Sequence, residues 1–148
     1  MSDESDALPI AALRASFLDV VDRKPVVVSS PTGSGKSTEI PRWCRASAPA
    51  ARVLVIEPRR VACRSLAARV ADLEGCRLGE AVGYVVRDDK TMSDATRIVF
   101  ATPGIVLRQP DLLEGSATVI LDEFHERTLD VDLLLALLVR RRTSGLVV

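Results

Sequence analysis

Six residues, DEFHER at 122–127, bring together two adjacent carboxylates, the only histidine of the chain and a further Glu–Arg pair. Such a group suits a metal site, an acid/base pair or a nucleotide-hydrolysing motif. A zinc site is disfavoured because Cys44, Cys63 and Cys76 lie far apart and no second histidine completes a ligand set. His125 is therefore interpreted as a hydrogen-bonding or solvated residue, since a lone histidine in a loop seldom ligates a metal.

A second segment, SSPTGSGKST at 29–38, has the composition of a phosphate-binding loop and lies between an apolar run and a helical pattern. Gly33 and Gly35 let backbone N–H groups turn inward around phosphate oxygens, and the helix that follows points its positive end at them. Lys36 can then reach the β and γ phosphates, while the Ser37 hydroxyl can ligate Mg²⁺. Ser30 departs from the general pattern, which has glycine there; a solvated Gly/Ser-rich turn is the alternative.

The two carboxylates of DEFHER follow the apolar run TVIL, so they stand at the carboxyl end of a predicted buried strand. In an open α/β sheet this end is where ligands bind. Asp122 is expected to hold Mg²⁺ through water, and Glu123 to orient and deprotonate an attacking water. The alternative is a charged strand end before a helix N-terminus, where the helix dipole favours acids.

The elements that must position these residues follow from apolar periodicity. Helices are predicted over 8–23, 36–47, 59–73, 104–109 and 129–141. Strands are predicted over 26–30, 52–58, 81–86, 97–102 and 118–123, with the final LVV opening a further strand. Because the strands are apolar on both faces and alternate with helices, the fold class is a three-layer α/β/α domain with a mainly parallel sheet.

Composition limits the classes of function. The chain has 148 residues, 47% of them hydrophobic, and equal numbers of basic and acidic residues, 20 of each. It is predicted to form one domain over 8–148 after an acidic N-terminal tail at 1–7. Net neutrality excludes histone-like binding but permits local binding of a polyanion. The N-terminus lacks a secretory signal, and the longest apolar stretch falls short of the ~20 residues of a membrane span, so we expect a cytoplasmic protein with reduced thiols and no membrane partner.

Five segments in one order and spacing carry a family resemblance. PTGSGKST, EPRRVACRSLAARVA, VGYVVR, ATPG and LDEFHER resemble the first RecA-like domain of DEAH-box helicases of superfamily two, most of all the HrpB type, over about residues 8–148. The resemblance implies a RecA-like P-loop NTPase domain, incomplete at its C-terminal end, that uses ATP and Mg²⁺. It implies an ATP-dependent RNA helicase that moves on single-stranded nucleic acid, with a second RecA-like domain expected C-terminally.

The resemblance also assigns residue roles. In the family, the positions of Arg59, Arg60 and Thr102 contact the nucleic-acid backbone, which suits arginine because its planar fork matches phosphate oxygens. Arg87 is expected to add a strand contact, and His125 to couple the site to the second domain. The ATP-binding residues implied are Thr32, Gly33, Ser34, Gly35, Lys36, Ser37, Thr38 and Arg69, the last packing on the adenine ring.

The sequence departs from the family pattern at two positions, and two alternatives to the helicase function stay open. Pro103 stands where the family has an acidic residue, and Glu39 where it has glutamine. The isolated chain is expected to turn over little ATP, because an arginine finger from the second domain is worth ~10³ to 10⁵ in rate. The rivals are a catalytically incompetent fragment that binds nucleotide or RNA, and a P-loop ATPase that acts on DNA or on a protein. Each arginine has a solvated or ion-paired alternative.

Overall fold

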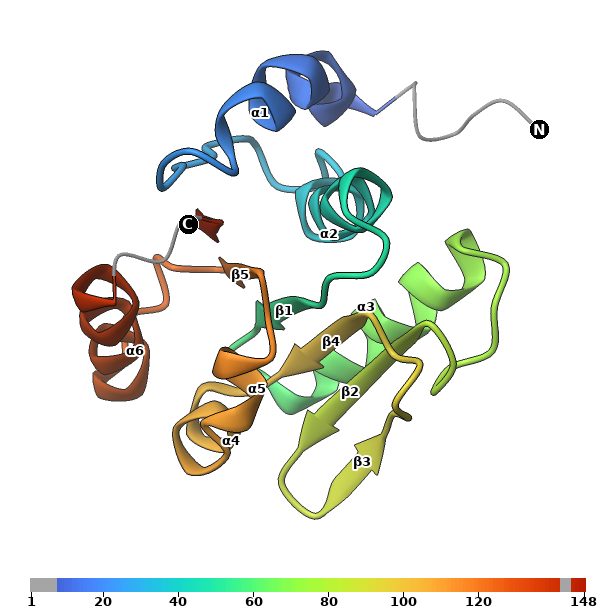
Figure 1. The fold of residues 1–148 in the computed structure, drawn as a ribbon, viewed down its shortest axis with the longest axis vertical. Coiled ribbons are helices and arrows are strands. Elements are labelled where there is room, and N and C mark those ends of the chain that lie inside the picture. The colour runs from blue at the N-terminus through green and yellow to red at the C-terminus, as the bar shows by residue number, and fades with distance from the viewer. Residues whose placement is uncertain (1–7, 142–144) are drawn as a thin grey trace.

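A mainly parallel sheet forms the centre of the computed structural model, which describes residues 8–141 and 145–148 (Figure 1). Its strands within these residues are β1 Val53–Ile56, β2 Val82–Val86, β3 Asp89–Thr91, β4 Ile98–Ala101, β5 Thr118–Leu121 and β6 Leu146–Val147. The strand order is β3-β2-β4-β1-β5-β6, and only the β2–β3 pair is antiparallel. The parallel strands therefore end at a common edge.

Helices cover both faces of the sheet, as Figure 1 shows. The 3₁₀ helix η1 Pro9–Leu13 and the helices α1 Arg14–Val20, α2 Lys36–Ser47 and α3 Arg60–Leu73 lie on one face, and α4 Pro103–Arg108, α5 Asp111–Glu114 and α6 Leu129–Arg140 on the other. Successive strand residues alternate between the two cores: Val53 and Val55 face the first, Leu54 and Ile56 the second. The predicted three-layer α/β/α class is confirmed.

The strand predicted over 26–30 is wrong in extent. Val26 forms only an isolated bridge to Val147, and the ladder continues no further than a hydrogen bond from the Val28 N–H to the Val148 carbonyl, 2.8 Å. The described part of the chain gives this segment a neighbour on one side alone, and Val27 is 79% exposed. An apolar run predicts a buried strand only where the sheet continues on both sides.

The sequence analysis missed two short elements, β3 and α5. The β2–β3 hairpin turns at Asp88, whose φ is +61°. The Tyr84 hydroxyl donates to the Asp89 carboxylate at 3.0 Å, which closes the hairpin. Its strand DKT is polar and lies at the sheet edge, so it lacks the apolar signal on which the strand predictions depended.

Glu39, a departure from the family pattern, has a structural explanation. Its carboxylate is 1% exposed and accepts a 2.8 Å hydrogen bond from Arg42 one turn along α2. Arg42 also donates to Glu74 at the end of α3, 2.8 Å, and Arg45 donates to the same carboxylate. Glu39 thus belongs to an ion network that ties α2, the helix after the phosphate loop, to α3.

The cysteines are free, as expected. Cys44 and Cys63 are buried in the core and Cys76 is half-buried. Burial raises the pKa of the Cys44 and Cys63 thiols to about 12, so both are neutral packing groups. Among the helices of residues 8–141, none has the length and apolar character needed to cross a membrane.

Candidate active site

The site lies at the edge where the parallel strands end. The segment before the phosphate loop pairs with β6: the Val26 N–H donates to the Leu146 carbonyl and the Val28 N–H to the Val148 carbonyl, each at 2.8 Å. β6 in turn pairs with β5, which runs into DEFHER. The two halves of the predicted site therefore lie on either side of a single strand.

The phosphate loop has the backbone that its glycines permit. Gly33 and Gly35 take φ of +77° and +91°, in the left-handed region that other residues rarely adopt. Gly35 caps α2 without any side-chain hydrogen bond, so the first N–H groups of the helix face outward for a ligand. Ser30, the departure from the pattern, hydrogen-bonds the hydroxyl of buried Ser34 at 2.8 Å and so braces the loop.

Two adjoining cavities collect the predicted residues. One, of about 390 Å³, is lined by Lys36, Ser37, Asp122, Glu123 and His125 together with apolar residues of β1, β5 and β6. The other, of about 320 Å³, is lined by the whole loop from Ser30 to Thr38 and again by Glu123 and His125. Volumes of this order are typical of small-ligand sites. The structure thus brings together two segments far apart in the sequence.

Asp122 has a free oxygen that fits a cation. Its side chain is 6% exposed, and Oδ1 accepts the Glu123 N–H at 2.9 Å. Oδ2 is buried with no hydrogen-bond partner. A buried carboxylate oxygen without a partner is costly, so the site favours a positive ligand. The Ser37 hydroxyl lines the same cavity, and this pair of hard oxygen donors suits Mg²⁺.

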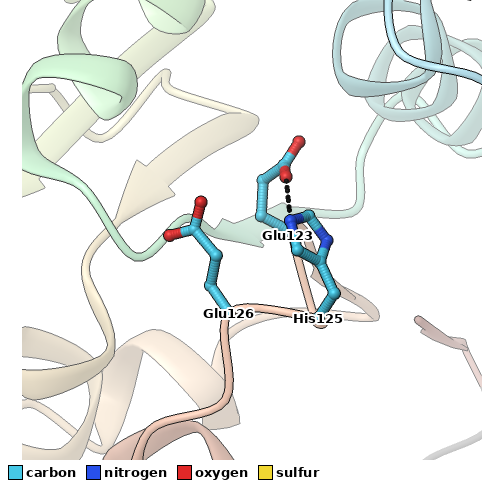
Figure 2. Close-up of side chains that lie close together, drawn as sticks. All are labelled: Glu123, His125 and Glu126. Atoms are coloured by element: carbon cyan, nitrogen blue, oxygen red, sulfur yellow. Dashed lines mark ion pairs between the residues drawn. The ribbon is translucent and has the colours of Figure 1, made fainter.

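Glu123 is held in a strained turn. Its φ of +51° is unusual for a residue with a side chain, and such strain collects at functional sites. Its carbonyl accepts the Glu126 N–H at 2.9 Å. Figure 2 shows the His125 ring facing the Glu123 carboxylate, with Nε2 to Oε2 at 3.2 Å. His125 thus lies beside the predicted base.

The same view raises the metal alternative for DEFHER. Glu123, His125 and Glu126 each offer a ligand atom, and these atoms all lie within 4.8 Å of one another (Figure 2). However, the guanidinium of Arg59 lies 3.6 Å from the Glu126 carboxylate and already supplies positive charge there. A cation therefore fits Asp122 and Ser37 better than the cluster around Glu126, whose charge is already balanced by Arg59.

Glu57 lies near the carboxylates of Asp122 and Glu123, and the sequence analysis did not single it out. It follows β1, is 1% exposed and accepts the Arg59 N–H at 3.2 Å. Burial raises its pKa to about 7, and the nearby charges of Asp122 and Glu123 act in the same direction, while the Arg59 N–H opposes them. The available signal was its position: like Asp122, it is an acid directly after an apolar strand.

Replacement of Glu57 by glutamine is expected to flatten the dependence of stability on pH. In the folded domain the Glu57 carboxyl group keeps its proton up to about pH 7, whereas in the unfolded chain it loses the proton near pH 4.5. The free energy of unfolding of the wild type therefore falls as pH rises from 4.5 to 7, and the whole loss is present above pH 7. This loss is about 3 kcal/mol at most, and glutamine, which does not titrate, removes it. Urea unfolding without Mg²⁺ or nucleotide, from pH 4.5 to 8, measures it. Parallel profiles for both proteins would contradict it.

The arginines assigned to nucleic acid lie at the same edge. Arg59 and Arg60 follow β1 and Arg87 follows β2, and all three are exposed. Arg60 donates to the Arg87 carbonyl at 2.9 Å, which joins the two turns. The Arg87 side chain also lies 3.6 Å from Asp88, so the ion-paired alternative is partly present there. This edge of the sheet therefore carries three exposed arginines, none of which lines either of the two cavities.

Comparison with known families agrees with this geometry. The sequence profile of the DEAD/DEAH box helicase family matches residues 12–133. The chain belongs to this family. The structure also superposes on the crystal structure of the Escherichia coli DEAH/RHA helicase HrpB with a TM-score of 0.84 and 38% identity, over 95% of this chain and 19% of that one. The RecA-like fold is thereby shown.

Curated relatives in the family carry RNA helicase names. The chain is 42% identical over 142 residues to the probable ATP-dependent RNA helicase DHR2 of Saccharomyces cerevisiae, covering 90% of this chain and 19% of that protein. It is 41% identical over 138 residues to the ATP-dependent RNA helicase HrpB of Escherichia coli, covering 89% and 17%. The chain thus spans about a fifth of the length of these relatives.

Thr102 and Arg69 of this DEAD/DEAH domain lie outside the two cavities. Thr102 precedes α4 at the same edge, and Pro103 is the first residue of that helix. A proline there costs no hydrogen bond, because the first N–H groups of a helix have no partner within it. Arg69 is exposed on α3 and does not line either of the two cavities, so its adenine contact stays a prediction.

Proposed function

We propose that this DEAD/DEAH domain binds ATP with Mg²⁺ and serves as the first motor domain of an RNA helicase. One observation carries the proposal: Lys36, Ser37, Asp122 and Glu123 line a single cavity at the carboxyl edge of the sheet. Each comes from a segment whose sequence suits phosphate or metal chemistry. The unpartnered Oδ2 of Asp122 supports the metal part.

The residues of the site then have distinct tasks. The loop N–H groups cradle the phosphates, except those of Ser34 and Thr38, which donate to the Pro31 and Gly35 carbonyls at 3.2 Å. Lys36 pairs with the β and γ groups. Ser37 and Asp122 hold Mg²⁺, which neutralises phosphate charge when bound. Glu123 accepts a proton from the attacking water, and the His125 ring at 3.2 Å orients its carboxylate.

RNA is proposed as the polymer because the named relatives are RNA helicases. Arg59, Arg60, Arg87 and Thr102 stand at one edge, where they would contact successive phosphates of a single strand. A second RecA-like domain would face the same edge, supply the arginine finger and meet His125, while Arg69 would pack on the adenine ring. ATP hydrolysis would then alternate the two domains between closed and open states along the strand.

Metal removal tests the nucleotide site directly. A fluorescent ADP analogue titrated into the domain is expected to bind at least tenfold more weakly in EDTA than in Mg²⁺, because Asp122 and the phosphates would then repel each other. Fluorescence anisotropy measures both affinities. Equal affinity in the two buffers would contradict the assignment of Ser37 and Asp122.

A parallel titration with single-stranded RNA and DNA of equal length, at one stated salt concentration, separates the RNA proposal from the DNA alternative.

A further inference from the structure

Arg59 is shared between two carboxyl groups that differ in burial and in the number of their contacts. Its Nε lies 3.6 Å from Glu57, and a terminal nitrogen lies 3.6 Å from Glu126. The Glu57 side chain is 1% exposed and fixed by the Arg59 N–H, whereas that of Glu126 is 36% exposed and, among the described residues, has Arg59 as its ion-pair partner. The Arg59 side chain is itself 62% exposed, so a phosphate can reach it from solvent. Glu57 therefore anchors the arginine, and Glu126 is the partner that can leave.

Glu126 is joined by its backbone to the predicted base. The Glu126 N–H donates to the Glu123 carbonyl at 2.9 Å, which closes a turn whose first residue has a φ of +51°. The turn is anchored on both sides: Asp122 is buried at the strand end, and Arg127 donates to Asp132 of α6 at 2.6 Å. A displacement of Glu126 is therefore taken up between 123 and 126, where the Glu123 carboxylate meets the His125 ring.

We propose that Glu126 is a positioning residue that couples nucleic-acid binding at Arg59 to the placement of Glu123. A phosphate that approaches Arg59 meets the like charge of Glu126 3.6 Å from the same guanidinium, so the carboxylate must give way. Because a carboxylate oxygen of Glu126 lies within 4.8 Å of the Glu123 carboxylate and the His125 ring, its departure removes a negative charge beside their contact, and that contact shifts. RNA bound at this edge of the sheet thereby acts on the Glu123 carboxylate without contacting it. This inference rests on the proposed function, because it requires Arg59 to bind a strand of nucleic acid.

The test uses the fact that His125 is the only histidine of the chain. In protein free of any affinity tag, the imidazole signals in NMR spectra come from this residue alone, and its ring contacts the Glu123 carboxylate at 3.2 Å. A twelve-nucleotide oligouridylate is titrated into wild-type and Glu126→Gln protein, and fluorescence anisotropy follows binding in parallel. Glu80→Gln is the matched control, since Glu80 is half-exposed, pairs with Arg77 and lies at the opposite end of β2.

We expect the RNA to shift the His125 signals of the wild type and of Glu80→Gln alike. In Glu126→Gln the RNA should bind two- to fivefold more tightly, because the repelling charge is gone, yet shift the signals at least threefold less. Equal shifts in Glu126→Gln and the wild type, or saturated binding without any shift in the wild type, would overturn the coupling alone. RNA that fails to bind the wild type would overturn the proposed RNA function and the coupling together.

Discussion

Lys36→Ala is expected to lower the affinity of the domain for ATP at least a hundredfold. Among the described residues that line the two cavities, Lys36 is the only lysine or arginine. It is the first residue of α2, directly after the left-handed Gly35, so its position is fixed by the loop. A hydrogen bond to a charged partner contributes about 1.5–3 kcal/mol, so the loss of two such bonds, to the β and γ phosphates, corresponds to at least about a hundredfold in affinity.

Isothermal titration with Mg-ATP measures this effect, and Lys24→Ala is its matched control because Lys24 is exposed and lines neither cavity. The thermal midpoint should change little in either variant, since Lys36 makes no side-chain hydrogen bond or ion pair among those found in the described residues. Unchanged nucleotide affinity in Lys36→Ala would refute the phosphate-loop assignment, and this result does not depend on the role of residues 122–127.

Glu123→Gln is expected to separate binding from turnover. The amide keeps the size of the side chain and its place beside His125, but it cannot accept a proton from water. ATP affinity should stay within about threefold, whereas hydrolysis should fall ~10² to 10⁴-fold, the usual range for loss of a general base. The rate is measured with saturating RNA in a protein in which this domain is joined to a second RecA-like domain.

Glu114→Gln provides the control for this experiment. Glu114 ends α5, ahead of β5, so it lies at the opposite end of the strand from Glu123, and its carboxylate lies 3.9 Å from the guanidinium of Arg141. Its hydrolysis rate should match that of the wild type. A Glu123→Gln protein that keeps more than a tenth of the wild-type rate would show that another group activates the water.

Most of the fold was predictable because its signals are local. The helices α2, α3 and α6 begin and end within a residue of their predictions, since each has a clear apolar face and a turn at its start. The strand at 26–30 failed because burial on both faces depends on neighbours that local sequence does not encode. Polar β3 failed for the complementary reason, that pairing at a sheet edge needs no apolar side chain.

The candidate site was predictable as two motifs but not as a network. Strand ends and glycine turns predict where Lys36 and Asp122 meet, because the carboxyl ends of parallel strands share an edge. Nothing local predicts that Glu57 is buried beside Asp122, or that Arg59 lies between Glu57 and Glu126. Such contacts depend on which strands are neighbours, and only the β4-β1-β5 order brings these turns together.

The short strand β6 sets the distance between the two halves of the phosphate site. It lies between β5 and the segment that enters the loop, so two strand spacings of about 4.8 Å each set the gap from the loop to Asp122. That gap of about 10 Å is the width available to a triphosphate and its metal. Leu146 and Val147 face opposite cores, so a register slip of one residue would turn both the wrong way. The distance between the two halves of the site is therefore set by Leu146 and Val147, which take no part in the chemistry.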